Sequence, residues 1–219
     1  MGQAFFDAIK AGRLDEVKSL AGADPLLLRA RDSNGSSAIL FAIYNGRKDV
    51  AEVLIAPGAP LDLFEASALN RVERIEEILR AEPQRVSEYA PDGFTPVALA
   101  AFFGHADVVR TLIAAGADVR APARNAFKVQ ALHAAVAGRN LEIVMAVLEA
   151  GADPNAQQQA GFRPIDEAGS HANRALAELL IAHGADPRLR ADSGKNAIEL
   201  AREKGHTEFA TWLEQSPSP

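Results

Sequence analysis

Residues 92–118 read DGFTPVALAAFFGHADVVRTLIAAGAD and contain two apolar stretches, each followed by a glycine. Thr95 can cap a first helix, and Pro96 suits its first position, where the missing N–H would have no helical partner anyway. Gly104 and Gly116 can adopt the left-handed conformation that closes a helix. The stretch therefore predicts a turn, a short helix, a second turn and a longer helix.

The closing Gly-Ala-Asp recurs along the chain, at 116–118, 151–153 and 184–186, with spacings of 35 and 33 residues. A relic of it occurs at 58–60, as Gly-Ala-Pro. Small alanines also recur at one phase of the short helix, which lets successive short helices approach closely. Units of this length stack into a solenoid in which each unit contacts its neighbours.

This pattern resembles the ankyrin repeat, in which a turn is followed by Thr-Pro-Leu-His, Ala-Ala, Gly-His and a closing Gly-Ala-Asp. Residues 90–121 match best, and residues 130–135 keep the Leu-His and Ala-Ala parts of the next unit. The resemblance covers nearly the whole chain. It implies an all-α ankyrin-repeat solenoid of about seven helix-turn-helix units, with short finger turns between them.

A longer duplication is also visible, because residues 5–62 align with residues 63–120 at an offset of 58 without a gap. Each block begins with a unit that lacks a proper finger turn. We expect a single domain over residues 1–215 and a disordered tail over residues 216–219. The units are expected near residues 3–30, 31–62, 63–89, 90–121, 122–156, 157–190 and 191–215.

Composition excludes several classes of function. The net charge is −6 and the 23 lysines and arginines are scattered, so we expect no nucleic-acid partner. There is no apolar run of about 18 residues and no signal-like start, which predicts neither a membrane span nor a leader. The chain has no cysteine, which fits a cytoplasmic location.

No residue pattern indicates catalysis, a cofactor or a metal. Three of the five histidines occupy repeat positions, and the resemblance implies that His133 ties neighbouring fingers together by hydrogen bonds. Asp166 and Glu167 are adjacent and point about 100 degrees apart on a helix, so we interpret both as solvated charges. His171 lies on the side that ankyrin-like proteins use for contacts and is a candidate to touch a ligand. We therefore predict a protein without enzyme activity.

The resemblance also implies where a partner would bind. In the family, the concave face is lined by the finger tips and by the two residues before the glycine that ends each short helix. At these positions apolar side chains cluster in units two to five, and exposed aromatic clusters anchor interfaces. The alternative for Phe102 or Phe103 is packing between short helices. The predicted partner-binding residues are Tyr44, Asn45, Leu69, Phe94, Phe102, Phe103, Arg124, Phe127, Lys128 and His171.

The finger at 121–129 is longer than the next one. Its tip carries Arg124, Phe127 and Lys128, a basic and aromatic group that suits a partner with acidic and apolar side chains. The alternative is a loop that packs on its own repeat.

We therefore predict a non-catalytic protein-protein interaction module that binds a protein partner on its concave face. The alternatives are an inhibitory, immunity-type or effector protein, and a small-molecule-binding protein or enzyme, which would need a closed pocket with convergent polar groups. We expect a monomer, with self-association through the apolar patch as the other possibility.

Overall fold

The computed structural model describes residues 2–55 and 61–217 of the chain. Within these ranges it contains fourteen α-helices and three short 3-10 helices, and no β-strand is formed there. The prediction of an all-α solenoid is confirmed. The α-helices are α1 (Gly2–Ala11), α2 (Leu14–Ala23), α3 (Ala38–Tyr44), α4 (Lys48–Leu54), α5 (Leu63–Ala68), α6 (Val72–Ala81), α7 (Pro96–Phe102), α8 (Ala106–Ala114), α9 (Ala131–Ala137), α10 (Leu141–Glu149), α11 (Pro164–His171), α12 (Arg174–Ala182), α13 (Ala197–Glu203) and α14 (Thr207–Gln215). The 3-10 helices are η1 (Pro25–Arg29), η2 (Pro83–Ser87) and η3 (Gln159–Gly161).

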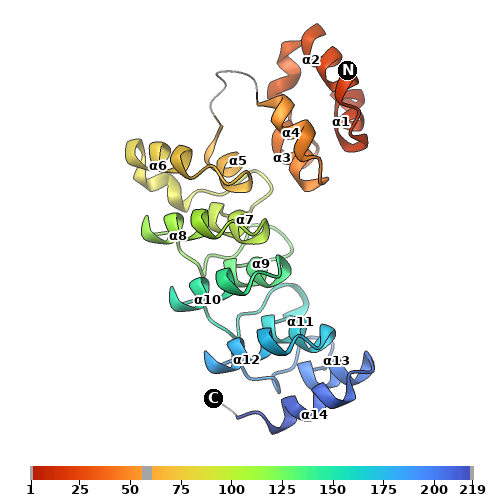
Figure 1. The fold of residues 1–219 in the computed structure, drawn as a ribbon, viewed down its shortest axis with the longest axis vertical. Helices are drawn as coiled ribbons and strands as arrows, with labels where there is room; N and C mark the ends of the chain where they lie inside the picture. Colours follow the sequence, from red (N-terminus) through yellow and green to blue (C-terminus); the bar gives the residue numbers. More distant parts are fainter. Residues whose placement is uncertain (1, 56–60, 218–219) are drawn as a thin grey trace.

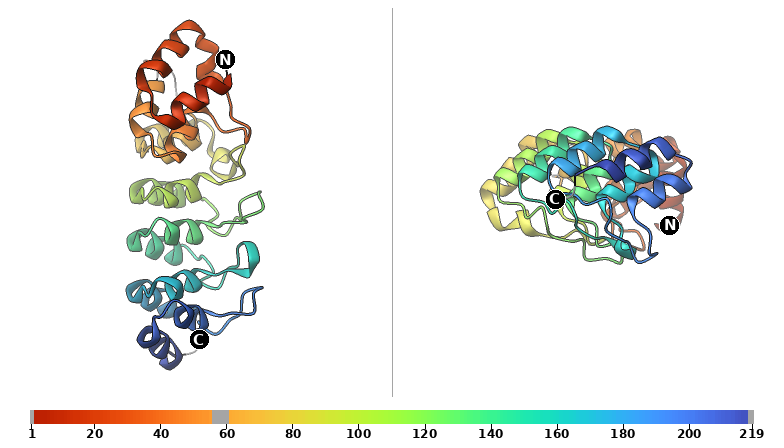
Figure 2. Two further views of the ribbon diagram at one scale, coloured as in Figure 1. Left: turned by 90° about the vertical axis from the view of Figure 1, so that its right-hand side faces the viewer. Right: turned by 90° about the horizontal axis from the view of Figure 1, so that it is seen from below.

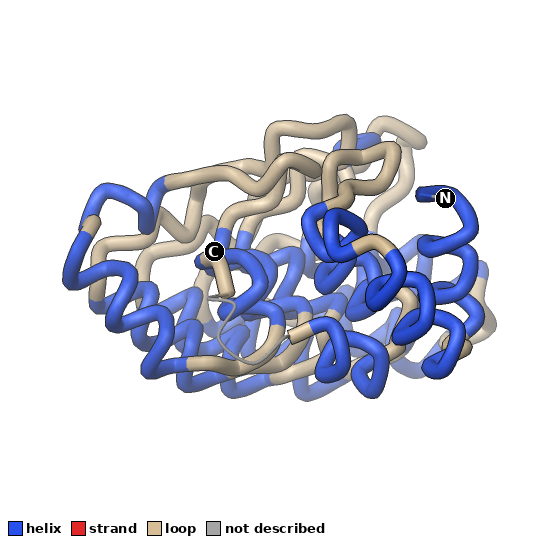
Figure 3. Tube along the Cα trace, turned by 90° about the horizontal axis from the view of Figure 1, so that it is seen from above, coloured by secondary structure: helices blue, strands red, loops and turns tan. Residues whose placement is uncertain are grey.

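These described α-helices form consecutive pairs that are stacked along the long axis of the molecule (Figure 1). From α5 onward the odd-numbered helices follow one another in one layer, and α6, α8, α10 and α12 lie beside them in a second layer. The connecting turns between pairs gather on one side of the stack, as Figure 2 and Figure 3 show. Binding positions on the short helices and on these turns can therefore face the same side.

Side-chain caps start several of the short helices. Thr95 accepts a hydrogen bond from the backbone N–H of Ala98 at 3.2 Å, and Pro96 is the first residue of α7. The α5 helix instead begins with a capping box, in which Asp62 and Glu65 each accept the other's backbone N–H. Each cap satisfies an N–H group that has no partner within its helix, which explains why the helices begin where the sequence pattern predicts.

The buried side chains form two clusters. One is centred on α1 to α4 and contains the fully buried Phe5 and Ile9. The other runs from Leu61 to Leu213 and continues through all later helix pairs. Leu69 packs against both clusters and so joins them.

Two glycines mark places where short helices approach most closely. A Cβ on Gly138, which directly follows α9, would lie 2.7 Å from the carbonyl oxygen of Phe102 in α7. A Cβ on Gly169 of α11 would meet the backbone of Ala197 in α13 in the same way. Both pairs of helices therefore need a residue without a side chain at the contact.

Two features predicted from the sequence lie wholly or partly outside the described residues. The Gly-Ala-Pro relic at 58–60 lies outside them, and so do residues 218–219 of the expected tail. Ser216 is described: its side chain is buried, its hydroxyl donates to the carbonyl of Trp212, and its own carbonyl accepts from Arg188.

Candidate partner-binding surface

A cavity of about 330 Å³ lies where α7, α9 and α11 meet the turns that precede them. Its walls are mostly apolar. Three of the predicted partner-binding residues line it, namely Tyr44, Phe94 and Phe102. The sequence analysis did not select the other lining residues, which include Val129, His133, Ala137, Gln158, Phe162 and Arg163.

An aromatic row leads into this cavity from the side of α3. The Tyr44 ring stacks on Phe103 with centroids 5.9 Å apart, and Phe103 meets Phe102 edge to face at 5.1 Å. Phe102 is 48% exposed, whereas Phe103 and Phe94 are half-buried against the first core cluster. Of the two adjacent phenylalanines, Phe102 is therefore exposed and Phe103 is partly packed against its neighbours.

Tyr44 is held in place by a hydrogen bond that joins the end of α3 to the turn before α7. Its hydroxyl donates to Asp92 Oδ2 at 2.6 Å, and Asp92 belongs to the turn before α7. Burial, the hydrogen bond to Asp92 and its negative charge all raise the pKa of the Tyr44 hydroxyl above its ordinary value. The hydroxyl therefore stays protonated and remains a donor at neutral pH.

The long finger is tied to both neighbouring turns by its backbone. The N–H of Arg124 donates to the carbonyl of Gly93 at 2.8 Å, and the carbonyl of Phe127 accepts from the N–H of Gln159 at 2.9 Å. At the tip, Phe127 is 55% exposed, Lys128 is exposed, and the exposed Arg124 places its guanidinium 3.8 Å from the centre of the Tyr89 ring. The finger thus has a fixed backbone and exposed aromatic and basic side chains.

Seven of the ten predicted residues do not line the cavity, namely Phe103, the three finger residues, Asn45, Leu69 and His171. Asn45 donates from its side chain to the carbonyl of Phe41 at 2.8 Å and so helps to end α3. Leu69 is half-buried between the two core clusters. His171 is exposed at the end of α11, with its Nδ1 at 3.3 Å from a carboxylate oxygen of Glu167.

His133 is buried and bonded through both ring nitrogens. Nδ1 accepts from the backbone N–H of Gln130 at 3.3 Å, so Nε2 carries the proton and donates to the carbonyl of Ala156 at 3.0 Å. Burial lowers the pKa of His133 to about 4. The neutral ring links α9 to the turn before α11, which is a structural role, although one side of the ring also lines the cavity.

The interpretation of Asp166 as a solvated charge is wrong. Its side chain is fully buried, because it turns back to the start of α11 and accepts the backbone N–H of Arg163 at 2.8 Å. Burial raises the pKa of Asp166 to about 6. Glu167, its neighbour, is half-buried and lines the cavity.

Arg163 is the charged residue that the sequence analysis missed. It is only 7% exposed, and its Nη1 donates to the carbonyls of Gly161 and Arg190 at 3.1 and 2.9 Å. Its Nε is buried without a partner. No carboxylate among the described residues lies within 4.0 Å of its guanidinium. Arg163 precedes Pro164, and nothing in the surrounding sequence distinguishes it from an exposed arginine in an ordinary turn.

The described residues contain no group of three or more His, Cys, Asp or Glu side chains arranged to hold a metal ion. None of the helices in the described part of the chain is long and apolar enough to cross a membrane.

Comparison with known proteins matches this architecture. The family described as "Ankyrin repeats (3 copies)" matches residues 63–158, and the family described as "Ankyrin repeats (many copies)" matches residues 5–55. Together the two ranges cover about two thirds of the chain.

Individual relatives fall into two groups. The chain is 26% identical over 224 residues to the putative ankyrin repeat protein YahD of Escherichia coli, and the match covers 94% of this chain and 92% of the relative. It is 29% identical over 153 residues to the tyrosine-protein kinase Shark of Drosophila melanogaster, which is 69% of this chain but 16% of the kinase. It is 31% identical over 198 residues to the Ankyrin repeat and KH domain-containing protein mask-1 of Caenorhabditis elegans, covering 88% of this chain and 7% of the relative. The chain thus spans a small fraction of several relatives and nearly all of the bacterial one.

Proposed function

Because the chain belongs to the ankyrin-repeat family, whose members generally serve as protein-protein interaction modules, we propose that it binds a protein partner on its concave face without catalysing a reaction. The partner contacts an aromatic surface made of the exposed Tyr44, Phe102 and Phe127, with Phe94 and Phe103 as its half-buried floor. The protein acts as a cytoplasmic monomer.

The observation that supports this proposal is the exposure of three large aromatic side chains around one cavity. Tyr44, Phe102 and Phe127 are 38%, 48% and 55% exposed. Burying a fully exposed large apolar side chain is worth roughly 1.5–3 kcal/mol, and because these three side chains are about half exposed, each can contribute about half of that to a complex. Their backbones are held by helix α7, helix α3 and a finger that is bonded on both sides, so little ordering is needed when a partner binds.

We expect that changing Phe102 and Phe127 together to serine abolishes capture of the partner. The immobilised protein and the double variant are each exposed to a lysate of the source cells, and bound proteins are identified by mass spectrometry. Both side chains are exposed, so the variant keeps its core. A bound protein should be recovered with the unchanged chain and fall at least about tenfold with the variant, since central aromatic residues carry most of an interface's energy.

The matched control changes Leu141 and Met145 of α10 to serine. These side chains are 39% and 44% exposed, they belong to the outer helix of unit five, and they are equally apolar. The control should capture the partner as the unchanged protein does. Loss of capture with the control and retention with the Phe102 and Phe127 variant would place the site on the outer helices and contradict the proposal.

The cavity favours small-molecule binding as the second candidate function. Its apolar walls include the polar side chains Gln158 and Arg163, which can orient a ligand. A protein partner is the better proposal, because Phe127 lies outside the cavity and a small ligand inside would leave it exposed.

A further inference from the structure

We propose that the cavity between α7, α9 and α11 receives one large apolar side chain of the partner, and that the same partner segment carries carboxylates that pair with the arginines and lysine around it. This inference rests on the proposed function, because it names the chemistry of the partner that the aromatic surface binds.

The shape and lining of the cavity fit an apolar anchor. Its volume of about 330 Å³ is near the lower end of the range for ligand pockets, which suits a side chain rather than a large cofactor. Phe94, Leu99 and Phe102 form one wall, and Val129 and Phe162 form another. An aromatic or aliphatic side chain that enters would be removed from water on several sides, as anchors at the centre of interfaces are.

Arg163 can pair with a carboxylate of the partner that lies next to this apolar anchor. Arg163 is one of the residues that line the cavity, its side chain is nearly buried, and its Nη2 group makes no hydrogen bond to the described residues. The carboxylate of Asp166 is engaged by the backbone N–H of Arg163 instead of by the guanidinium. A buried cation without a direct ion pair is costly, and a carboxylate from the partner can form the missing charge-assisted bond.

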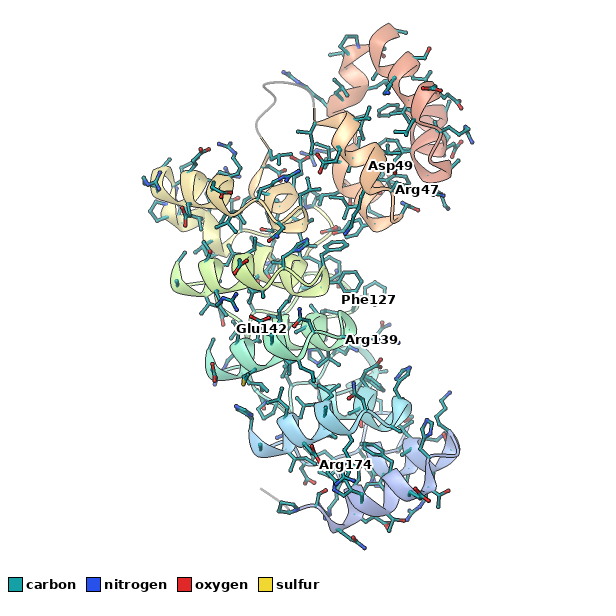
Figure 4. All side chains as sticks on the ribbon, viewed as in Figure 1. Arg47, Asp49, Phe127, Arg139, Glu142 and Arg174 are labelled. Atoms are coloured by element: carbon teal, nitrogen blue, oxygen red, sulfur yellow. The ribbon has the colours of Figure 1, made fainter. Side chains whose placement is uncertain are left out.

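The surroundings of the cavity are basic as well. We call Arg124, Lys128 and Arg139 the basic rim; all three are exposed and form no ion pair with the described residues. Arg139 stands two residues after Ala137, the last residue of α9, which lines the cavity, and Figure 4 shows Arg139 and Phe127 at the same edge of the molecule beside α9.

Two acidic groups also lie at this surface. Asp92 accepts the hydroxyl of Tyr44, and Glu167 lies against His171. Both keep their negative charge, but the basic rim and Arg163 together outnumber them, so the charge that meets a partner is positive on balance, although the chain as a whole carries a net charge of −6. Complementary charge selects the partner and speeds its approach more than it adds affinity.

A library of random twelve-residue peptides displayed on phage tests the inference. Selection on the intact protein should enrich peptides in which Phe, Trp, Leu, Ile or Met stands within about three residues of Asp or Glu. Enrichment of apolar residues without acidic ones, enrichment of Lys and Arg, or failure to enrich any sequence would overturn it.

Two pairs of variants then locate the binding of a selected peptide. Ala137→Phe fills the cavity from the last residue of α9, and Ala114→Phe makes the same change at the exposed last residue of the outer helix α8. The first should weaken peptide binding by at least about tenfold, and the second by less than about twofold. Likewise Arg139→Glu should weaken binding several-fold, whereas Arg80→Glu, an equal charge change on the outer helix α6, should not.

Failure of this inference can be told apart from failure of the proposed function. A lysate partner that is lost with the Phe102 and Phe127 variant but is retained by Ala137→Phe would leave the aromatic surface as the binding site and remove the cavity from it. If the lysate partner is lost with the Phe102 and Phe127 variant and also with Ala137→Phe, while Ala114→Phe still captures it, the cavity is supported as the anchor site.

Discussion

Changing Gly169 to alanine is expected to lower the free energy of unfolding by about 2–3 kcal/mol. A Cβ at this position would press against the carbonyl oxygen of Ala197 and would lie 3.0 Å from its carbonyl carbon and from its Cα. These are backbone atoms of α13, which cannot rotate away as the end of a side chain could. The two helices would have to separate, and overpacking of this kind costs about 1–3 kcal/mol. Urea denaturation followed by circular dichroism measures the change.

Gly22 provides the control, because it is also a helical glycine. It lies in α2, it is exposed, and a Cβ there would meet no atom within 4 Å. Gly22→Ala should therefore stabilise the protein by about 0.5–1 kcal/mol, the ordinary gain when alanine replaces glycine in a helix. Opposite signs for the two substitutions are the expected result. A stabilising Gly169→Ala would show that α11 and α13 do not approach as closely as the geometry requires.

The sequence predicted the repeat architecture well because its signals are local. Pro96 is the first residue of α7, and α7 ends at Phe102, two residues before Gly104. Each of these signals acts within one turn of helix, through a missing N–H or a left-handed backbone, so it can be recognised without knowledge of the neighbouring unit. The positions of Phe102 and Phe103 came from the family resemblance instead, which left packing between short helices open for either one; Phe102 is exposed and Phe103 is half-buried.

The cavity could not be predicted because it depends on the spacing between units. Gly138 lets α9 approach α7, and Gly169 lets α11 approach α13, whereas the cavity lies in the interval between α9 and α11. No local pattern marks this interval. The burial of Arg163 and Asp166 could not be predicted from a helical pattern either, since Arg163 bonds to the carbonyl of Arg190 in the following unit and Asp166 turns back to the N–H of Arg163.

The contribution of His133 to the stability of the chain should fall as the pH is lowered from 7 to 4. Its pKa is about 4 in the folded protein, against 6.5 for an unperturbed histidine. The unfolded chain therefore binds a proton between these values while the folded chain does not, so stability is lost progressively as the pH falls through this range. The difference of about 2.5 pKa units corresponds to about 3 kcal/mol at full effect.

The comparison that isolates this effect uses His133→Gln, whose amide can still donate to Ala156 but does not titrate. Denaturation at several pH values should show the unchanged protein losing about 3 kcal/mol more than the variant between pH 7 and 4. Asp166 acts in the opposite direction, because its folded pKa of about 6 lies above the ordinary 3.8 and its native state gains stability as it binds a proton. Since Asp166 is present in both proteins, its contribution cancels in the difference. Equal pH dependence in the two proteins would mean that the ring of His133 is solvated and that its bond to the carbonyl of Ala156 does not hold the turn before α11.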